Sequence, residues 1–544
     1  MIIFVRKLLY MQRYLLIFLL IFTAITGFYF FWSWSELPSG HRYIYPLDDV
    51  YIHLALARNF ALHGIWSINS AGFDSASSSI LYTLLLGFLI KIFGDWEFYP
   101  LIINVVFSYL AIYVVYRYFK DFFGKRELLL AFILLIPFSL LYMTLLLGME
   151  HTIHMFLMIS AIYLIQKNVK TDFNKKDFIG LLVVVFFISI IRFESMFFTL
   201  SLALALFLRK RIGEGISVLI AGFFPIIIFG LLSLYSGGFF FPNSVVIKGS
   251  FPSGVHFLQS CWMIFRDGIL LNTSFYKCLF FPFVIVAVYI WKNYKSKNVW
   301  DVRKETLLIT LILTAAVHSL FAFLKYRYEN YLMISMILLL VPVIIEFWDD
   351  IRQKNAKFNI PNIMMAGSII VVFLVSIYRL GYHDKPLKLG SKGINEQQIE
   401  MSRFLGQYYK GQKVIANDIG AIAYFSHVQL LDMVGLGSTD VARMKVANKH
   451  KTRDEYIVNN KKFITEYASR NQYKIAVIYP EWFPGSPPSS WIPVASWTIP
   501  EKYGPAIRRV VFYAVDTSEK ETLRKKLSEF DLNPNVEEWF YLYK

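Results

Sequence analysis

The stretch Pro46-Leu-Asp-Asp-Val-Tyr-Ile-His-Leu-Ala-Leu-Ala-Arg-Asn-Phe60 follows the first long apolar run of the chain. It opens with two adjacent carboxylates, Asp48 and Asp49, close to a segment long enough to span a bilayer. A pair of ionised carboxylates is costly to hold beside a membrane. Their simplest interpretation is a solvated loop or a helix N-cap, because Asp favours that position. The residues that follow along the chain favour a functional site instead.

The composition indicates a membrane protein that ends in a small soluble domain. Of the 544 residues, 56% are hydrophobic and 18% are aromatic, and the mean hydropathy is +0.49. This balance excludes an ordinary soluble globular protein. The apolar runs end near residue 380, and the remainder has mixed composition. We therefore expect a polytopic α-helical membrane module at 1–384 and an exterior, periplasmic α/β domain at 385–544.

The formal charge of +17 does not indicate a nucleic-acid partner. The basic residues lie in short loops between apolar runs, which is the positive-inside pattern of a membrane protein. These loops are at 120–126, 167–176, 209–211, 292–304 and 352–357. No Walker motif or glycine-rich phosphate loop is present in the sequence, so a nucleotide-driven cytoplasmic engine is not expected.

Requiring each basic loop to be cytoplasmic predicts about eleven crossings, with a cytoplasmic amino terminus. The first run, 14–32, is read as a signal anchor, since no small-residue cleavage site follows it. The run 80–93 is short and would break the parity, so we expect an interfacial or re-entrant helix there. The other spans are expected at about 98–118, 127–147, 150–167, 178–191, 194–208, 216–235, 275–291, 305–324, 328–348 and 362–380.

The carboxyl-terminal domain reads as a small α/β fold. Strands are expected at 413–416, 473–479 and 509–515, with a helix after the turn that contains Asp418 and Gly420. The stretch 482–497 is rich in Pro, Ser and Trp and is expected to be a long exterior loop.

An ordered series of segments resembles the GT-C superfamily, the integral-membrane glycosyltransferases that use polyprenyl-phosphate sugars. The resemblance is strongest to bacterial arabinofuranosyltransferases and protein-mannosyltransferase-like enzymes. The segments are Asp48-Asp49-Val-Tyr-Ile with Ala57-Arg58-Asn59, Gly148-Met149-Glu150, Arg192-Phe-Glu194, Pro242-Asn243 with Lys248, Arg327-Tyr328, Asp418-Ile-Gly420 and Asp432-Met-Val-Gly435. Ser79 and Phe193 stand where the family often has Pro.

The resemblance implies a hexosyl- or pentosyltransferase with a polyprenyl-phosphate sugar donor and an envelope glycan, lipid or protein acceptor. Asp48 is expected to be the general base, because the first acid of the pair has that role in the family. Asp49 is the alternative base, or orients the sugar. If the site holds a divalent ion, Mg²⁺ or Mn²⁺, Asp48 and Asp49 are its expected ligands. The expected substrate-binding residues are Arg58, Glu150, Arg192, Glu194, Asn243, Lys248, Arg327 and Tyr328.

Two alternatives stay open. One is a ligase that moves a polyprenyl-linked glycan, and the other is a transporter with an exterior sensing domain. Paired broken helices in two related halves would favour transport, and no such repeat is seen in the sequence. The expected location is the bacterial inner membrane, with the carboxyl-terminal domain outside.

Overall fold

The computed structural model describes residues 2–38, 42–249, 257–296, 301–322, 324, 327–353, 359–503 and 507–542. The chain forms two compact units, each built from several segments. The first unit comprises Met1–Phe28, Leu101–Ile228 and Gly249–Asp384, and the second comprises Tyr29–Pro100, Phe229–Lys248 and Lys385–Lys544. The division at residue 384 into a membrane module and an exterior domain stays a prediction.

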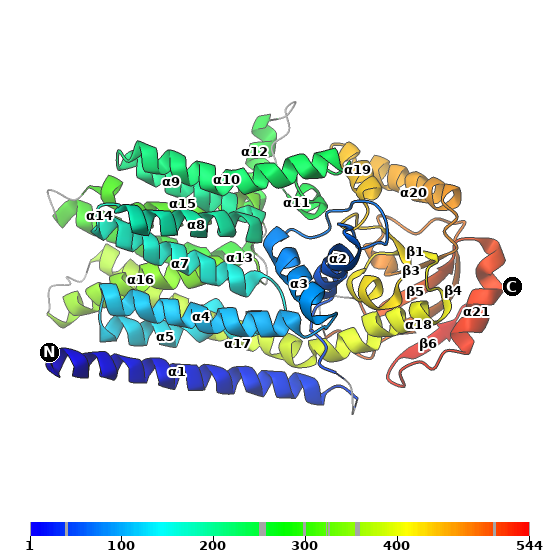
Figure 1. The fold of residues 1–544 in the computed structure, drawn as a ribbon, viewed down its shortest axis with the longest axis horizontal. Coiled ribbons are helices and arrows are strands. Elements are labelled where there is room, and N and C mark those ends of the chain that lie inside the picture. The colour runs from blue at the N-terminus through cyan, green and yellow to red at the C-terminus, as the bar shows by residue number, and fades with distance from the viewer. Residues whose placement is uncertain are drawn as a thin grey trace. The chain divides into compact units, whose positions relative to one another are not determined.

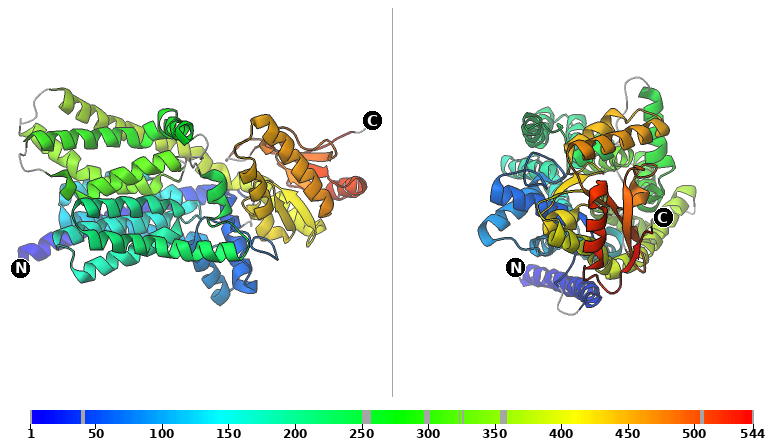
Figure 2. Two further views of the ribbon diagram at one scale, coloured as in Figure 1. Left: turned by 90° about the horizontal axis from the view of Figure 1, so that it is seen from above. Right: turned by 90° about the vertical axis from the view of Figure 1, so that its right-hand side faces the viewer.

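The first unit is a bundle of apolar helices that run side by side (Figures 1 and 2). At its centre lies α16 (Asn330–Arg352), which is buried over most of its length and packs against α5, α7, α14 and α15. Helices without a polar face are typical of large cores and of membranes. The helices are α1 (Ile2–Ser35), α4 (Tyr99–Phe122), α5 (Lys125–Ser139), α6 (Leu141–Leu146), α7 (His151–Lys170), α8 (Lys175–Ile191), η1 (Phe193–Ser195), α9 (Met196–Leu208), α10 (Ile212–Tyr235), α12 (Phe257–Phe265), η2 (Arg266–Leu270), α13 (Thr273–Phe275), η3 (Tyr276–Phe280), α14 (Phe281–Ser296), η4 (Val302–Lys304), α15 (Thr306–Phe321) and α17 (Ile360–Ile394).

The expected helical, multi-span character is confirmed. Six helices in the described chain are long and apolar enough to cross a membrane: Met11–Ser35, Tyr99–Phe122, Ile212–Tyr235, Thr273–Lys295, Asn330–Arg352 and Ile360–Tyr408. Shorter apolar helices include Ile80–Phe93, Phe193–Leu208 and Thr306–Phe321. Length alone does not decide which short helices cross, so the count of eleven and the re-entrant role of 80–93 stay predictions.

The second unit contains a mixed six-stranded sheet in the order β2-β1-β3-β5-β4-β6. The expected strands at 413–416, 473–479 and 509–515 are present as β1, β3 and β5. Strand β1 is parallel to β2 and β3, with Val414 opposite Leu430 and Ile475, and the remaining pairs are antiparallel. The strands are β1 (Lys413–Ala416), β2 (Gln429–Asp432), β3 (Ile475–Ile478), β4 (Ile492–Thr498), β5 (Arg509–Ala514) and β6 (Glu537–Phe540).

Helices cover both faces of the sheet (Figure 1). Alternate strand residues such as Ile415 and Ala476 pack with Ile464 of α20 on one face. On the other face Phe404 of α18 contacts Trp497 and Phe512. The helices of this domain are η5 (Asn395–Ile399), α18 (Glu400–Tyr408), η6 (Ile422–Ser426), α19 (Thr439–Ala447), α20 (Arg453–Arg470), η7 (Pro480–Trp482), η8 (Thr517–Glu519) and α21 (Lys520–Ser528).

The expected exterior loop at 482–497 is wrong in its second half. Residues from Ile492 onward form β4, and Trp491 and Trp497 are buried. The ring of Trp497 lies 4.4 Å from that of Phe512, and burying such a ring stabilises the strand. Pro493 is tolerated because the register between β4 and β5 shifts between Pro493 and Ala495.

The second unit also contains α2 (Asp49–His63), α3 (Ile80–Phe93) and α11 (Asn243–Lys248). Helix α2 is buried through its first two turns and packs against α3 and η6. Gly87 of α3 faces α2, and a Cβ atom there would make an ordinary contact at 3.4 Å with the Ala57 carbonyl oxygen. The Asp48–Asp49 pair is therefore carried by a helix that the carboxyl-terminal domain contacts directly.

Candidate functional site

Asp48 immediately precedes α2, yet its side chain does not cap that helix. Its carboxylate instead accepts hydrogen bonds from the backbone N–H groups of Gly420 (2.5 Å) and Ala421 (2.7 Å). These residues begin the helix that follows β1, where the first N–H groups have no partner within the helix. The Asp48 side chain is buried, so a carboxylate from one end of the chain satisfies donors at the other.

Only glycine fits at position 420. A Cβ atom on Gly420 would lie 2.0 Å from the Asp48 carbonyl oxygen and 2.7 Å from its Oδ2. The resemblance motif Asp418-Ile-Gly420 thus has a physical reason, since any side chain at 420 displaces Asp48.

Asp418 adds a third hydrogen bond to the Asp48 carboxyl group. Gln398 Nε2 donates to Asp418 Oδ2 (2.7 Å) and to the Tyr479 hydroxyl (3.0 Å). Burial and the adjacent Asp48 charge raise the pKa of Asp418 well above its ordinary value. The neutral form of Asp418 is therefore the favoured one of this pair. Burial also raises the pKa of Asp48, opposed by its three hydrogen bonds.

This carboxyl pair lies at the carboxyl ends of β1 and β3. The chain leaves β1 toward β2 on one side and returns in β3 on the other, and such switch points are where open α/β sheets bind ligands. Asn417 joins the two strand ends, since its side chain donates to the Tyr479 carbonyl (2.9 Å) and accepts from the Tyr479 N–H (3.0 Å). Asp49, half-buried on α2, adds negative charge that raises the pKa of Asp48 and Asp418.

Arg58 lies further along α2 and binds carbonyl groups of η6. Its guanidinium donates to the carbonyl oxygens of Tyr424 (2.6 Å) and Ala423 (3.4 Å) and lies 4.8 Å from the Tyr424 ring centre. Asp95 is 3.7 Å away. These contacts give Arg58 a structural role in holding η6, and its contact with substrate stays a prediction.

Asn243 and Lys248 begin and end α11. Asn243 is buried, and its amide donates to the Leu436 carbonyl (3.1 Å) and to Thr439 Oγ1 (3.3 Å). Lys248 is exposed, so its ammonium group is accessible to an anion.

The sequence does not indicate the contact that Asp74 makes with Thr439. Asp74 Oδ1 accepts from the N–H and the hydroxyl of Thr439, both at 2.7 Å, at the start of α19. The Asn69 side chain forms two hydrogen bonds with the backbone of Leu430 in the edge strand β2. It donates to the Leu430 carbonyl (3.0 Å) and accepts from the Leu430 N–H (2.7 Å). Nothing in the local pattern of 69–74 indicates these partners, which lie about 360 residues away.

The other predicted residues gather in the first unit around Arg192. This residue is extended between α8 and η1, and its guanidinium binds Glu194 through Nη2 (2.5 Å) and Nε (3.1 Å). Its Nη1 donates to Glu150 at the start of α7. Arg192 and Glu150 are buried, so all three guanidinium nitrogens satisfy carboxylates away from water.

Tyr328 extends this cluster. Its ring centre lies 4.9 Å from the Arg192 guanidinium and 5.2 Å from that of Arg327, and both are within cation–π range. His151 meets the same ring edge-on at 5.7 Å. Five predicted residues from separate segments, Glu150, Arg192, Glu194, Arg327 and Tyr328, are thus brought together.

Comparison with known proteins shows what this chain is similar to. A family model described as dolichyl-phosphate-mannose-protein mannosyltransferase matches residues 77–233, and a domain of unknown function matches residues 392–513. ArnT from Cupriavidus metallidurans bound to undecaprenyl phosphate aligns with a TM-score of 0.51 at 14% identity, covering 92% of this chain and 98% of that chain. The chain therefore shares the fold of ArnT, and its residues 77–233 match the mannosyltransferase family model.

Two further structures share the GT-C fold. Apo ArnT from the same organism aligns with a TM-score of 0.50 at 13% identity, covering 92% of this chain and 98% of that chain. The Archaeoglobus fulgidus oligosaccharyltransferase, in complex with Zn and sulfate, aligns with a TM-score of 0.50 at 13% identity, covering 95% of this chain and 74% of that chain. A comparison with curated protein sequences finds no match.

Asp48 and Asp49 are the expected ligands if a divalent ion binds. Across the described ranges, no three His, Cys, Asp or Glu side chains converge as ligands for an ion. Asp48 already accepts three hydrogen bonds, and a carboxylate offers about four lone-pair positions.

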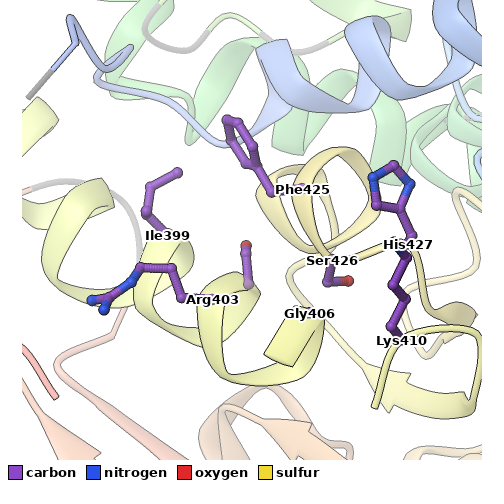
Figure 3. A pocket seen from close by; sticks show the side chains of 8 residues that line it. Ile399, Arg403, Gly406, Lys410, Phe425, Ser426 and His427 are labelled. Atoms are coloured by element: carbon purple, nitrogen blue, oxygen red, sulfur yellow. The ribbon is translucent and has the colours of Figure 1, made fainter. Parts of the chain in front are cut away.

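A pocket of about 290 Å³ lies on the carboxyl-terminal domain, between α18 and residues 425–427 (Figure 3). Arg403, Lys410 and His427 line it, and none of the predicted site residues does. The ring of Phe425 also packs 5.3 Å from that of Tyr51 on α2.

Proposed function

We propose that this protein transfers a monosaccharide from a polyprenyl-phosphate donor to a cell-envelope acceptor on the exterior face of a bacterial inner membrane. The observation that carries the proposal is the GT-C fold, shared over 92% of the chain with ArnT, which was crystallised with undecaprenyl phosphate. The family model at residues 77–233 supports glycosyl transfer independently.

In the proposed reaction, the acceptor hydroxyl oxygen forms a bond to the anomeric carbon of the donor sugar. The bond from that carbon to the phosphate oxygen breaks, and its electron pair leaves with the polyprenyl phosphate. The hydroxyl proton passes to Asp48 as general base. Burial supports this role, because it raises the pKa of Asp48 toward the working pH. Asp49 stays the alternative base, or a residue that orients the sugar.

The leaving phosphate needs cationic partners. We assign this role to Lys248, which is exposed, and to Arg327, whose guanidinium lies over Tyr328. Arg192 has its nitrogens occupied by Glu150 and Glu194, so we assign it the task of fixing these two carboxylates. Glu150 and Glu194 then provide acceptors for sugar hydroxyl groups.

A ligase that transfers a preassembled glycan is the second candidate. It is favoured by the alignment with the archaeal oligosaccharyltransferase over 95% of this chain. Both reactions use the same base and leaving group, and they differ in the size of the transferred sugar.

The decisive assay measures acceptor-dependent release of polyprenyl phosphate by the purified full-length protein in detergent, without a gradient. The donor panel includes single sugars and oligosaccharides on polyprenyl phosphate. We expect single-sugar donors to turn over, whereas turnover of oligosaccharide donors alone would establish the ligase. No release from any donor, together with gradient-dependent solute uptake in vesicles, would establish the transporter.

Asp48→Asn tests the base. The amide of Asn cannot take up the proton of the attacking hydroxyl group, so kcat is expected to fall by roughly 10²- to 10⁴-fold. Asp432→Asn is the matched control, because Asp432 is also buried at the carboxyl end of a neighbouring strand and accepts the N–H groups of Val434 (2.7 Å) and Gly437 (2.9 Å). Near-normal turnover of the Asp48→Asn protein would remove Asp48 from the mechanism.

A further inference from the structure

The carboxyl-terminal domain contacts the segment 48–74, which includes the proposed base, at three points. Asp48 binds the N–H groups of Gly420 and Ala421, Asn69 binds the backbone of Leu430, and Asp74 binds the start of α19. All three contacts lie on β2 or just beyond the carboxyl ends of β1 and β2. A sensing or accessory domain does not need to bind the side chain of the base, so these contacts point to a role in the reaction.

Resting on the proposed function, we propose that the turn Asp418–Ala421 is a positioning element for Asp48, with Asp418 and Gly420 as its positioning residues. Asp418 fixes the Asp48 carboxyl group by a side-chain hydrogen bond, and Gly420 leaves the space that this group occupies. Neither residue needs to touch the substrate. They act by holding Asp48 in one orientation, which sets the path of the acceptor proton.

The donors around the pair explain why Asp48, and not Asp418, serves as the acceptor of protons. Asp48 receives two backbone N–H groups aligned with the start of a helix, where partial positive charge accumulates. Asp418 receives one neutral side-chain donor, from Gln398. These backbone donors therefore favour the negative charge on Asp48.

Catalysis is sensitive to such positioning, because a misplacement of about 1 Å costs roughly 100-fold in rate. Gly420→Ala places a methyl group against Asp48 and is expected to lower kcat by roughly 100-fold while KM for the donor changes little. Gly213→Ala is the control, since Gly213 is also in the first turn of a helix but has no atom within 4 Å of its added Cβ.

Asp418 is tested by two substitutions that differ in hydrogen bonding. Asp418→Asn retains an N–H donor toward Asp48, and kcat is expected to stay within about tenfold of the parent. Asp418→Ala removes the donor to a charged group and is expected to lower kcat by about 10- to 100-fold. Rescue by Asn but not by Ala identifies positioning through a hydrogen bond. Equal kcat in both variants and the parent would overturn the role of Asp418.

Hydrogen exchange of the full-length protein tests the contact without any turnover. The N–H groups of Gly420 and Ala421 are expected to exchange slowly, and Asp48→Ala is expected to speed their exchange by at least tenfold. In Asp74→Ala the loss of protection is expected at Thr439 and not at Gly420. If no donor is turned over, the proposed function fails while these exchange rates still decide the contact. Unchanged exchange at Gly420 in Asp48→Ala, or parental kcat in Gly420→Ala, would overturn the positioning element.

Discussion

At the scale of single residues, the main feature is a carboxylate that occupies a helix N-terminus belonging to another part of the chain. In many α/β proteins the corresponding position binds a phosphate or another anion. Here the donors of Gly420 and Ala421 are used by Asp48. Asp48 is thereby held in one orientation, which its proposed role as general base requires.

The carboxyl pair makes stability depend on pH. Asp418 has a raised pKa in the folded protein, and its unfolded value is about 3.9. The folded state therefore holds a proton that the unfolded state has released, so stability falls as pH rises from about 4 toward the folded pKa, by up to about 1.4 kcal/mol per pH unit. Asp418→Asn cannot ionise. We expect its unfolding midpoint to rise relative to the parent as pH increases from about 4 to 8.

Thermal unfolding of the two proteins across this pH range measures the effect, with Asp74→Asn as a second buried acid for comparison. A constant difference between Asp418→Asn and the parent at every pH would show that Asp418 does not retain its proton in the folded state.

Lys248 and Arg327 are the residues proposed to bind the donor phosphate. Replacing either with Gln removes a charge-assisted hydrogen bond, which costs about 1.5–3 kcal/mol, or roughly 10- to 100-fold in kcat/KM for the donor. Acceptor KM is expected to change little. Initial rates over a grid of donor and acceptor concentrations separate the two effects, and an equal loss toward both substrates would argue against phosphate binding. Lys445→Gln serves as a basic control on α19, where the ammonium group donates to the Val434 carbonyl (2.9 Å).

At the scale of elements, α2 packs against η6. Side chains from α2 and from the residue before it bind both ends of the helix at 420–426. Asp48 binds the amino end of the helix at 420–426, and Arg58 binds carbonyl groups near its carboxyl end. The two charges match the helix dipole, negative at the start and positive at the end. Between them, the Tyr51 ring stacks on that of Tyr424 at 6.1 Å.

Substitution of Arg58 distinguishes a structural role of this residue from substrate binding. If it acts mainly by holding η6, Arg58→Gln lowers the unfolding midpoint and leaves donor KM within about threefold, because the lost bonds are to carbonyl oxygens of the protein itself, at about 1.5–3 kcal/mol for a charged donor. Donor titration and thermal unfolding of the same preparation test this. A large rise in donor KM with an unchanged midpoint would instead support direct binding of substrate by Arg58.

At the scale of the whole molecule, the orientation of the chain in the membrane is the property that decides where the reaction occurs. The positive-inside pattern predicts that the α/β domain faces the exterior and that the loop at 167–176 is cytoplasmic. The proposed transfer from a polyprenyl-linked donor outside the cell requires this orientation.

Thiol labelling of intact cells tests the orientation. In a protein whose Cys261 and Cys278 are replaced with Ser, we expect an impermeant reagent to modify Lys462→Cys and to spare Asp172→Cys; both native side chains are exposed, at 72% and 81%. Phe123→Cys decides whether α3 crosses, since protection there fits eleven crossings and modification means that 80–93 spans the membrane. Permeabilised cells supply the control in which all three positions react.

The sequence by itself determined the class of the molecule. Long apolar runs require a bilayer or a large core, and they predicted the helices of the first unit as well as α3 of the second unit at its observed bounds. Short apolar runs predicted β1, β3 and β5, because a strand buried on both faces reads as continuous hydrophobicity. The segments around Arg192 and Tyr328 were also predicted as parts of one site, through the order in which the motifs occur.

Only the tertiary structure decided which groups satisfy the predicted charges. Local patterns report which face of an element is buried, whereas the partner of a buried charge depends on donors that folding brings from elsewhere. Asp48 lies 372 residues from Gly420 in the chain, and no spacing within 46–60 indicates that its carboxylate caps that distant helix. For the same reason the sequence did not indicate which acceptors Arg58 and Arg192 bind. It also did not indicate the strand at 492–498, because Trp497 is buried by aromatic rings from other elements.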